Sequence, residues 1–325
     1  MNDKKLSTEP YKGVRDFYPE DMAVQNYIFD TWKKVAKEFG YQEYGASILE
    51  PAELYKAKGE RNEEIVNEQM YTFIDKGDRE VALRPEMTPT LARMVAARRK
   101  GLKLPLRWFS IPNCFRYERP QRGRKREHWQ LNCDLMGVTK DFSAIYAEVE
   151  IISLASKIMK EFGAKDEDFM IRIGNRKLIE EKMDKLGILN EIRSKIFGLI
   201  DIKEKDFEKY SNGITELGIE RENLEKELES LNQDSELISA LRSAGINNVC
   251  FDYSIVRGFD YYTGMVFEVF DTNKENPRAL FGGGRYDNLL EMFGVEPLPT
   301  VGFGMGDVTM RDFLEVHNLL PDNLK

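Results

Sequence analysis

The chain has 325 residues, of which 48 are basic and 56 acidic, so its formal net charge is −8. An acidic total argues against indiscriminate nucleic-acid binding, because such binding depends on neutralising phosphates. Apolar residues make up 42% and charged residues 32%, a composition typical of a globular protein with a sizeable core. The 3 cysteines are widely spaced and there are only 2 histidines, which indicates neither a disulfide framework nor a zinc site. The N-terminus is not a signal peptide and no run is long enough to span a membrane, so we expect a cytoplasmic protein.

The N-terminal part of the chain predicts helices that alternate with extended segments. In residues 21–39, apolar side chains recur at spacings of three and four, which indicates an amphipathic helix that ends at Gly40. Two short extended runs joined by KGDR predict a β-hairpin. The expected helices are 21–39, 88–100 and about 141–162, and the expected strands are 41–51, 70–75, 80–86, 107–118 and 128–137.

Residues 168–247 differ in character from the rest of the chain. They are rich in Lys, Glu, Leu and Ile, poor in Pro, and helical in period, which predicts a helical insertion. Predicted strands flank this block on both sides, so we expect one sheet built from both ends of the chain. Because hairpins dominate, we predict an α+β fold with a mostly antiparallel sheet flanked by helices. The expected division of the chain is 1–167, 168–247 and 248–325.

An arginine-rich segment, FRYERPQRGRKREHWQ at 115–130, concentrates six cations between two predicted strands. A loop at the end of a hairpin projects from its sheet, where a ligand can meet it. Arginine guanidinium groups match phosphate oxygens in bidentate geometry. We therefore interpret the segment as a phosphate clamp, with Arg116 on a nucleotide and the loop on a nucleic-acid backbone. The alternative is a solvated hairpin tip.

Further motifs carry residues that suit a ligand site. LRPEMTP contains Glu86 and Thr88, a carboxylate and a hydroxyl that can hold an ammonium group. IVRGFDYYTG places Arg257 among apolar and aromatic residues, with a structural ion pair to Asp260 as the alternative. FGGGRYD and VGFGMG are glycine-rich and let a backbone approach a ligand closely. The chain contains no P-loop or Rossmann fingerprint.

These motifs, preceded by KGVRDFYPED, occur in an order that resembles the catalytic domain of the histidyl-tRNA synthetases, which are class II aminoacyl-tRNA synthetases. The resemblance extends over nearly all of residues 10–320. It implies an insertion domain at 168–247 near the tRNA acceptor stem, and a homodimer formed through a first motif at about 41–57. It also implies a ligase that makes histidyl-adenylate from histidine and ATP and transfers the histidyl group to the 3′ end of tRNA(His). ATP with a bridging Mg²⁺ is expected, whereas zinc, haem and flavin are not.

The resemblance also implies roles for individual residues. Arg116 and Arg257 correspond to the catalytic arginines on the α-phosphate of ATP. The residues implied for histidine are Glu86, Thr88 and Gln130 at the ammonium group and Asp134 and Tyr262 at the imidazole, with Tyr261, Gly283, Gly284 and Gly304 beside them. Those implied for ATP are Arg116, Glu118, Arg124, Arg126 and Arg257, and those for tRNA are Arg119, Gln121 and Arg122, with no firm metal site.

Three positions depart from the family pattern. Asp134 stands where many members have Glu, and Met87 replaces a common Gly. Thr309 stands where the third motif usually carries an arginine for the γ-phosphate of ATP. We hypothesise that Arg311 or a cation of the loop substitutes for that arginine.

The chain stops at LLPDNLK, where the family continues into an anticodon-binding domain. The chain is then expected to be either a truncated form of the synthetase or a paralogue without that domain. The second hypothesis is therefore a histidine-binding regulatory subunit of ATP phosphoribosyltransferase, a synthetase paralogue that also lacks the domain. The paralogue does not need the arginines of the loop. Retention of Arg116, Arg124, Arg126, Arg257 and Glu86 therefore favours the enzyme. A third hypothesis, an RNA-binding module without catalysis, does not explain the residues implied for histidine.

Overall fold

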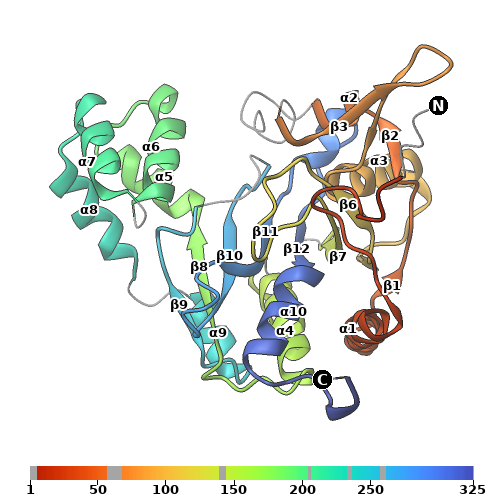
Figure 1. The fold of residues 1–325 in the computed structure, drawn as a ribbon. Coiled ribbons are helices and arrows are strands. Elements are labelled where there is room, and N and C mark those ends of the chain that lie inside the picture. Colours follow the sequence, from red (N-terminus) through yellow and green to blue (C-terminus); the bar gives the residue numbers. More distant parts are fainter. Residues whose placement is uncertain are drawn as a thin grey trace.

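The computed structural model describes residues 6–56, 68–138, 144–203, 206–232, 236–256 and 261–324. Within them, nine strands form one twisted sheet in the order β1-β5-β7-β12-β11-β10-β8-β9, with β6 paired to β7 (Figure 1). The pairings are antiparallel except for β1 with β5 and β8 with β9. The prediction of an α+β fold with a mostly antiparallel sheet is confirmed. The strands are β1 Gln42–Glu43, β5 Leu106–Ser110, β6 Asn113–Phe115, β7 Glu127–Met136, β8 Phe169–Asn175, β9 Val249–Phe251, β10 Met265–Asp271, β11 Ala279–Arg285 and β12 Thr300–Gly306.

Four helices cover one face of this sheet and form the main core with it. Alternate residues of the central strands point to this face, among them Phe267, Phe281 and Phe303, and they pack with the buried Trp32 and Phe313 of two helices. The alternation follows from the pleat of a strand, whose successive side chains point to opposite faces. The helices are α1 Pro19–Glu38, α4 Ala144–Glu161, α9 Glu236–Ser243 and α10 Asp307–Val316.

A smaller sheet and two more helices lie beside the edge of the main sheet that carries β5 and β7. Leu91 and Val95 of the longer helix pack with Leu106 and Met136 of those strands in a second core. Within the described residues, three antiparallel strands form the small sheet in the order β2-β4-β3. These elements are α3 Thr88–Arg98, α2 Glu53–Lys56, β2 Leu49–Pro51, β3 Tyr71–Ile74 and β4 Glu80–Leu83, with short 3-10 turns at Arg99–Gly101 and Leu289–Phe293. A further 3-10 turn, Asp322–Leu324, packs against the main core.

A helical unit projects from the far edge of the main sheet and has a core of its own (Figure 1). It is narrower than the predicted block 168–247. β8 lies in the main sheet between β10 and β9, and α9 packs in the main core. Outside β8 and α9, the helices predicted for this block agree with those in the structure. The helices of the unit are α5 Arg176–Lys185, α6 Asn190–Ile202, α7 Phe207–Glu216 and α8 Arg221–Glu229, followed by a 3-10 turn at Ser230–Asn232.

Most predicted elements appear within a few residues of their expected bounds. Two expected strands differ. The strand 41–51 divides into β1 and β2, which lie in different sheets. The strand 107–118 divides into β5 and β6 at Pro112, which cannot donate a backbone hydrogen bond. The described helices include none that is long and apolar enough to cross a membrane.

The packing around β8 gives a test of stability at Gly174. A Cβ at this position would lie 1.9 Å from the carbonyl oxygen of Ile255, a backbone atom that cannot move aside cheaply. We expect Gly174→Ala to lower the free energy of unfolding by roughly 1–3 kcal/mol, as overpacking does. Gly198, exposed within α6, has no atom within 4 Å of such a Cβ. Gly198→Ala is therefore expected to stabilise by roughly 0.5–1 kcal/mol. Denaturant unfolding of both variants checks the pair, and equal effects of one sign would contradict it.

Candidate active site

The face of the main sheet opposite the four-helix layer is unusual in its lack of side chains. Gly282 of β11 pairs with Gly304 of β12, and Gly284 pairs with Gly302. Because paired residues point to the same face, these four glycines form a bare strip across two adjacent strands. Gly302 and Gly304 pair in turn with Asp134 and Asn132 of β7, so polar side chains border the strip. Gly282, Gly302 and Gly304 form the floor of a smaller cavity, and Gly282 also lines a larger cavity beside it.

The smaller cavity has a volume of about 60 Å³ and is enclosed by acidic, amide and phenolic side chains. Tyr261, Tyr262 and Tyr286 form an aromatic wall, with ring centroids 5.0–6.1 Å apart. A Cβ at Gly284 would lie 2.8 Å from the ring of Tyr262, so glycine is what lets this ring rest on the sheet. The lining residues are Glu86, Thr88, Gln130, Asn132, Asp134, Tyr261, Tyr262, Gly282, Tyr286, Gly302, Phe303 and Gly304.

Asp134 is a buried acid of this cavity, with 3% of its surface exposed. The hydroxyl of Tyr286 donates a hydrogen bond to its Oδ1. Burial raises the pKa of Asp134 to about 7, although the hydrogen bond from Tyr286 opposes this shift. The carboxyl therefore changes its charge near neutral pH, and its ionised form would accept an N–H from a ligand in the cavity.

Glu86 and Thr88 lie on the other side of the same cavity, as their motif suggested. Glu86 is buried, and the hydroxyl of Tyr261 reaches toward both residues, at 3.4 Å from Glu86 Oε2 and 3.5 Å from Thr88 Oγ1. Gln130 closes the floor, where a Cβ at Gly304 would lie 2.8 Å from its amide nitrogen. The cavity thus combines a carboxylate at each end with hydroxyl and amide groups between them, a set that suits a small zwitterion with a polar side chain.

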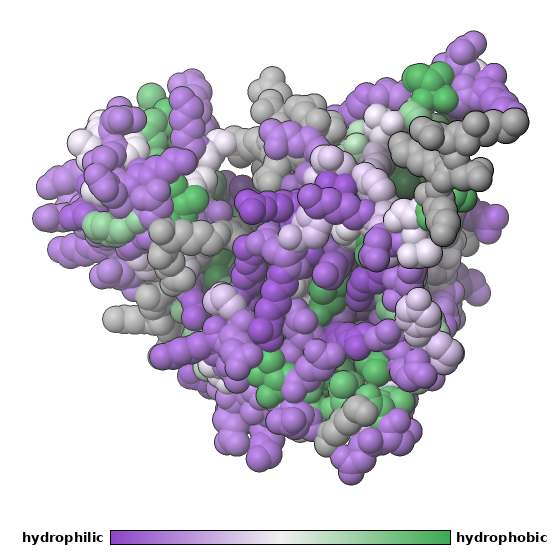
Figure 2. Space-filling view, viewed as in Figure 1, coloured by the Kyte–Doolittle hydropathy of each residue, from purple (hydrophilic) through white to green (hydrophobic). Residues whose placement is uncertain are grey.

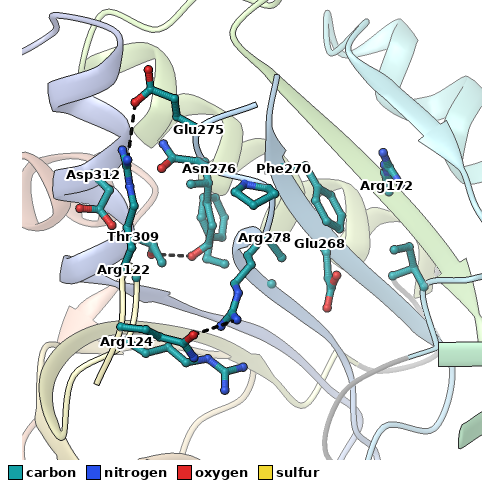
Figure 3. A pocket seen from close by; sticks show the side chains of 18 of the residues that line it. Arg122, Arg124, Arg172, Glu268, Phe270, Glu275, Asn276, Arg278, Thr309 and Asp312 are labelled. Atoms are coloured by element: carbon teal, nitrogen blue, oxygen red, sulfur yellow. Dashed lines mark hydrogen bonds and ion pairs between the residues drawn. The ribbon is translucent and has the colours of Figure 1, made fainter. Parts of the chain in front are cut away.

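The larger cavity has a volume of about 1070 Å³ and lies between the arginine-rich loop, the start of β11, the first turns of α10 and the helical unit (Figure 3). In the space-filling view, the surface between the helical unit and the main sheet is mostly hydrophilic (Figure 2). The charged residues that line the cavity are Arg122, Arg124, Arg172, Asp201, Glu268, Glu275, Arg278 and Asp312.

The arginine-rich loop turns back on itself at the mouth of this cavity. Gln121 and Arg124 exchange backbone hydrogen bonds of 3.0–3.1 Å, and Gly123 between them has φ +73°, a conformation that favours glycine. Arg124 pairs with Glu118 at 3.2 Å, and Arg122 pairs with Glu275 at 3.5 Å. The side chains of the loop are thus held at the cavity by two carboxylates, of which Glu275 is exposed and Glu118 is largely buried. A polyphosphate could displace the exposed carboxylate from Arg122.

Two other arginines of the segment are fixed in different places. Arg116 donates from Nε to the carbonyl of Pro85 at 2.9 Å, next to Glu86 of the small cavity. Arg126 lies outside the residues that line either cavity. Its guanidinium carbon is 3.8 Å from the ring centroid of Tyr117, and it donates to the hydroxyl of Tyr11 at 3.0 Å. Arg126 therefore anchors the base of the loop to the N-terminal segment, a position that differs from the ATP contact expected for it.

Four expected site residues remain, of which the structure describes three. Gly283 points to the main core, because a Cβ there would lie 2.6 Å from Phe303, so Gly282 and Gly302 line the cavities instead. Arg311 pairs with Asp21 at 2.9 Å on the helical layer. Arg257 lies outside the described residues, and Arg119 is exposed on the loop.

Sequence reasoning missed Asn132, Tyr286 and Arg278. A signal for Asn132 was available, since Gln130, Asn132 and Asp134 alternate along one strand and must share a face. Tyr286 lies within the FGGGRYD motif, but its contact with Asp134 joins residues that are 152 positions apart in the chain. Arg278 stands in a loop without a recognisable pattern.

Solved structures with this architecture are found among the aminoacyl-tRNA synthetases. The histidyl-tRNA synthetase of Nostoc sp. PCC 7120 matches with a TM-score of 0.80 at 25% identity, over 98% of this chain and 77% of its own. A Bacillus halodurans protein described as an ATP phosphoribosyltransferase regulatory subunit/histidyl-tRNA synthetase matches with a TM-score of 0.79 at 25% identity, over 96% and 84%. The fold is that of the class II synthetases.

Sequence comparison narrows the class further. The pattern that describes the histidyl-tRNA synthetases matches residues 13–307. A histidine–tRNA ligase of Leptospira biflexa is 46% identical over 99% of this chain and 77% of its own length. The chloroplastic/mitochondrial histidine–tRNA ligase of Arabidopsis thaliana is 39% identical over 98% and 68%. The chain belongs to the histidyl-tRNA synthetase family, and the family predicted from the motifs is confirmed.

The raised pKa of Asp134 predicts a stability difference that depends on pH. The pKa is about 7 in the folded chain and 3.8 as a reference, so ionisation costs the folded state progressively as the pH rises between these values. Asp134→Asn removes this cost. We expect the variant to gain stability relative to the parent between pH 4 and pH 7 and to keep that gain at pH 8.

Denaturant unfolding at pH 4.5 and pH 8 measures this difference. Asp30→Asn on the exposed face of α1 is the matched control for losing one carboxylate. A stability difference for Asp134→Asn that is the same at both pH values would contradict the prediction.

Proposed function

We propose that the chain is a histidine–tRNA ligase, which activates histidine with ATP and transfers the histidyl group to the 3′ end of tRNA(His). Two neighbouring cavities on one glycine floor carry this proposal, because the smaller suits histidine and the larger suits a nucleotide polyphosphate. The relatives named histidine–tRNA ligase, at up to 46% identity, support the same function.

Histidine would occupy the smaller cavity. Its ammonium group would lie against Glu86, Thr88 and Gln130, and its imidazole would lie between Asp134 and the ring of Tyr262. Ionised Asp134 accepts a hydrogen bond from an imidazole N–H, so the acid selects a side chain that has a donor at that point. A site that must satisfy such polar groups can reject apolar analogues by ~10⁴–10⁵.

ATP would occupy the larger cavity, with its α-phosphate toward the shared floor. The histidine carboxylate oxygen attacks the α-phosphorus, an O–P bond forms, and the bond to the β-phosphate oxygen breaks to release pyrophosphate. The charge that develops on the α-phosphate needs preorganised cations, the role that we assign to Arg116 and Arg257. The two substrates then react because they are held in line, not through covalent chemistry of the protein.

Mg²⁺ would enter as the partner of ATP. Within the described ranges, no three His, Cys, Asp or Glu side chains are grouped to hold a metal ion. Mg²⁺ commonly binds substrate phosphates and only one or two carboxylates. In this proposal, Glu268 and Asp312, which line the nucleotide cavity, would supply those carboxylates.

tRNA would approach the rim of the larger cavity. Arg119, Gln121 and Arg122 are exposed on the loop there and face the acceptor end in this proposal. The helical unit contributes Ile200 and Asp201 to the opposite wall, so it is positioned to contact the same end of the tRNA. We place this activity in the cytoplasm and in a homodimer formed around β2.

A second candidate is a histidine-sensing regulatory subunit, which the description of the Bacillus halodurans structure also names. Such a subunit needs the histidine cavity but not a nucleotide cavity lined with arginines. The presence of Arg122, Arg124, Arg172 and Arg278 around the larger cavity favours the ligase.

Pyrophosphate exchange without tRNA distinguishes the two candidates. We expect histidine-dependent incorporation of labelled pyrophosphate into ATP, and none with histidinol, which lacks the attacking carboxylate. Arg116→Ala and Arg257→Ala should each slow the exchange ~10²–10³-fold, because each removes one preorganised donor. Histidine binding without exchange in the parent chain would leave the regulatory subunit as the better account.

The glycine floor predicts a defect that is specific to histidine. In Gly304→Ala, the new methyl group displaces the amide of Gln130 into the small cavity. We expect the KM for histidine in pyrophosphate exchange to rise at least about tenfold, the loss of one good hydrogen bond, while the KM for ATP stays unchanged. Equal rises in both KM values would show a general distortion of the sheet instead.

A further inference from the structure

Arg278 lies at the centre of the larger cavity, immediately before β11 (Figure 3). Its guanidinium donates to the side-chain oxygen of Gln121 at 3.2 Å, across the cavity mouth from the arginine-rich loop. This contact joins a cation to a neutral amide, a weaker partner than a carboxylate.

The other arginines that line the cavity have carboxylate partners. Arg122 pairs with Glu275 at 3.5 Å, Arg124 with Glu118 at 3.2 Å, and Arg172 with Asp252 at 3.3 Å. Within the described residues, no ion pair is found for Arg278. The positive charge of Arg278 is therefore the least compensated among the arginines of this cavity, and an anionic ligand would neutralise it.

The adjacent wall explains why a cation is needed at this point. The hydroxyl of Thr309 donates to the carbonyl of Leu280 at 2.6 Å, two residues after Arg278. A Cβ at Gly123 of the loop would lie 3.5 Å from the methyl group of Thr309. Thr309 thus closes the space between the loop and the start of β11, and it brings no charge to the cavity.

Arg311 does not fill this gap in the structure. It pairs with Asp21 at 2.9 Å and with Glu315 at 2.8 Å, and it is not among the lining residues of the cavity. Binding a phosphate with Arg311 would require breaking both ion pairs, whereas Arg278 needs only to leave the amide of Gln121.

We propose that Arg278 binds the terminal phosphates of ATP and neutralises the pyrophosphate as it leaves, in place of a cation at position 309. The proposal rests on the proposed function, since it assigns the end of the nucleotide within the same cavity. No covalent bond to Arg278 forms or breaks. Its guanidinium gives up the hydrogen bond to Gln121 and donates instead to oxygens of the β- and γ-phosphates.

Equilibrium binding of ATP and AMP to the full chain tests this assignment without catalysis. In Arg278→Ala, ATP should bind about 10- to 100-fold more weakly, the loss of one charge-assisted contact, while AMP should bind as in the parent. Arg278→Lys should recover part of the affinity for ATP. Arg242→Ala on the exposed surface of α9 is the control for losing one positive charge.

Relocating the cation provides the decisive variant. In Arg278→Ala with Thr309→Arg, the new arginine starts from the neighbouring wall, and we expect it to restore much of the preference for ATP over AMP. In pyrophosphate exchange, Arg278→Ala should raise the KM for ATP by the same factor and leave the KM for histidine unchanged.

Three results would overturn the assignment: unchanged ATP binding in Arg278→Ala, an equal loss for ATP and AMP, or an ATP-specific loss in Arg311→Ala instead. Failure of the proposed function is a separate outcome. A parent chain without histidine-dependent exchange would refute the ligase, and the comparison of ATP with AMP would still decide the role of Arg278.

Discussion

Everything at this site depends on the alternation of side chains across β7, β12 and β11. On one face, Phe281 and Phe303 fill the core beneath the helices. On the other, Gly282, Gly302 and Gly304 leave the backbone bare. Because adjacent residues of a strand must face opposite ways, the same three strands supply both the core that holds them in place and the floor on which the ligands lie. A shift of the register by one residue would remove both together.

The charges of the site are arranged around this floor at two levels of exposure. Asp134 is buried, so its ionisation is costly and depends on the hydroxyl of Tyr286 and on a ligand that can donate to it. Arg122 and its partner Glu275 are both exposed, so Arg122 can exchange partners at low cost. Arg124 is exposed as well, but it pairs with the largely buried Glu118. An acidic chain can therefore present a cationic loop without losing solubility or binding anions indiscriminately.

Local sequence patterns were enough to predict most helices and strands, because hairpins and amphipathic helices have a characteristic periodicity of apolar residues. They failed where a long-range contact decides the outcome. β8 lies inside a helical block and was assigned to it, yet pairing with β10 draws it into the main sheet. Gly283 differs from its neighbours only through the register, and Arg126 is held by Tyr11, more than a hundred residues away. The contact of Tyr286 with Asp134 likewise joins residues that are far apart in the chain.

The position of Thr309 shows how a motif can change while the electrostatics of the cavity are kept. A phosphate requires a guanidinium within hydrogen-bonding distance. This guanidinium need not come from the helix of the third motif, which usually provides it. Thr309 and Arg278 lie on adjoining walls, connected through Leu280, so an arginine at either position can supply the cation without a change in the fold. A comparison of motifs along the sequence detects only the loss of the arginine at position 309. In the structure, Thr309 donates to the carbonyl of Leu280, and Arg278, the cation that we propose in its place, precedes Leu280 by two residues and lines the same cavity.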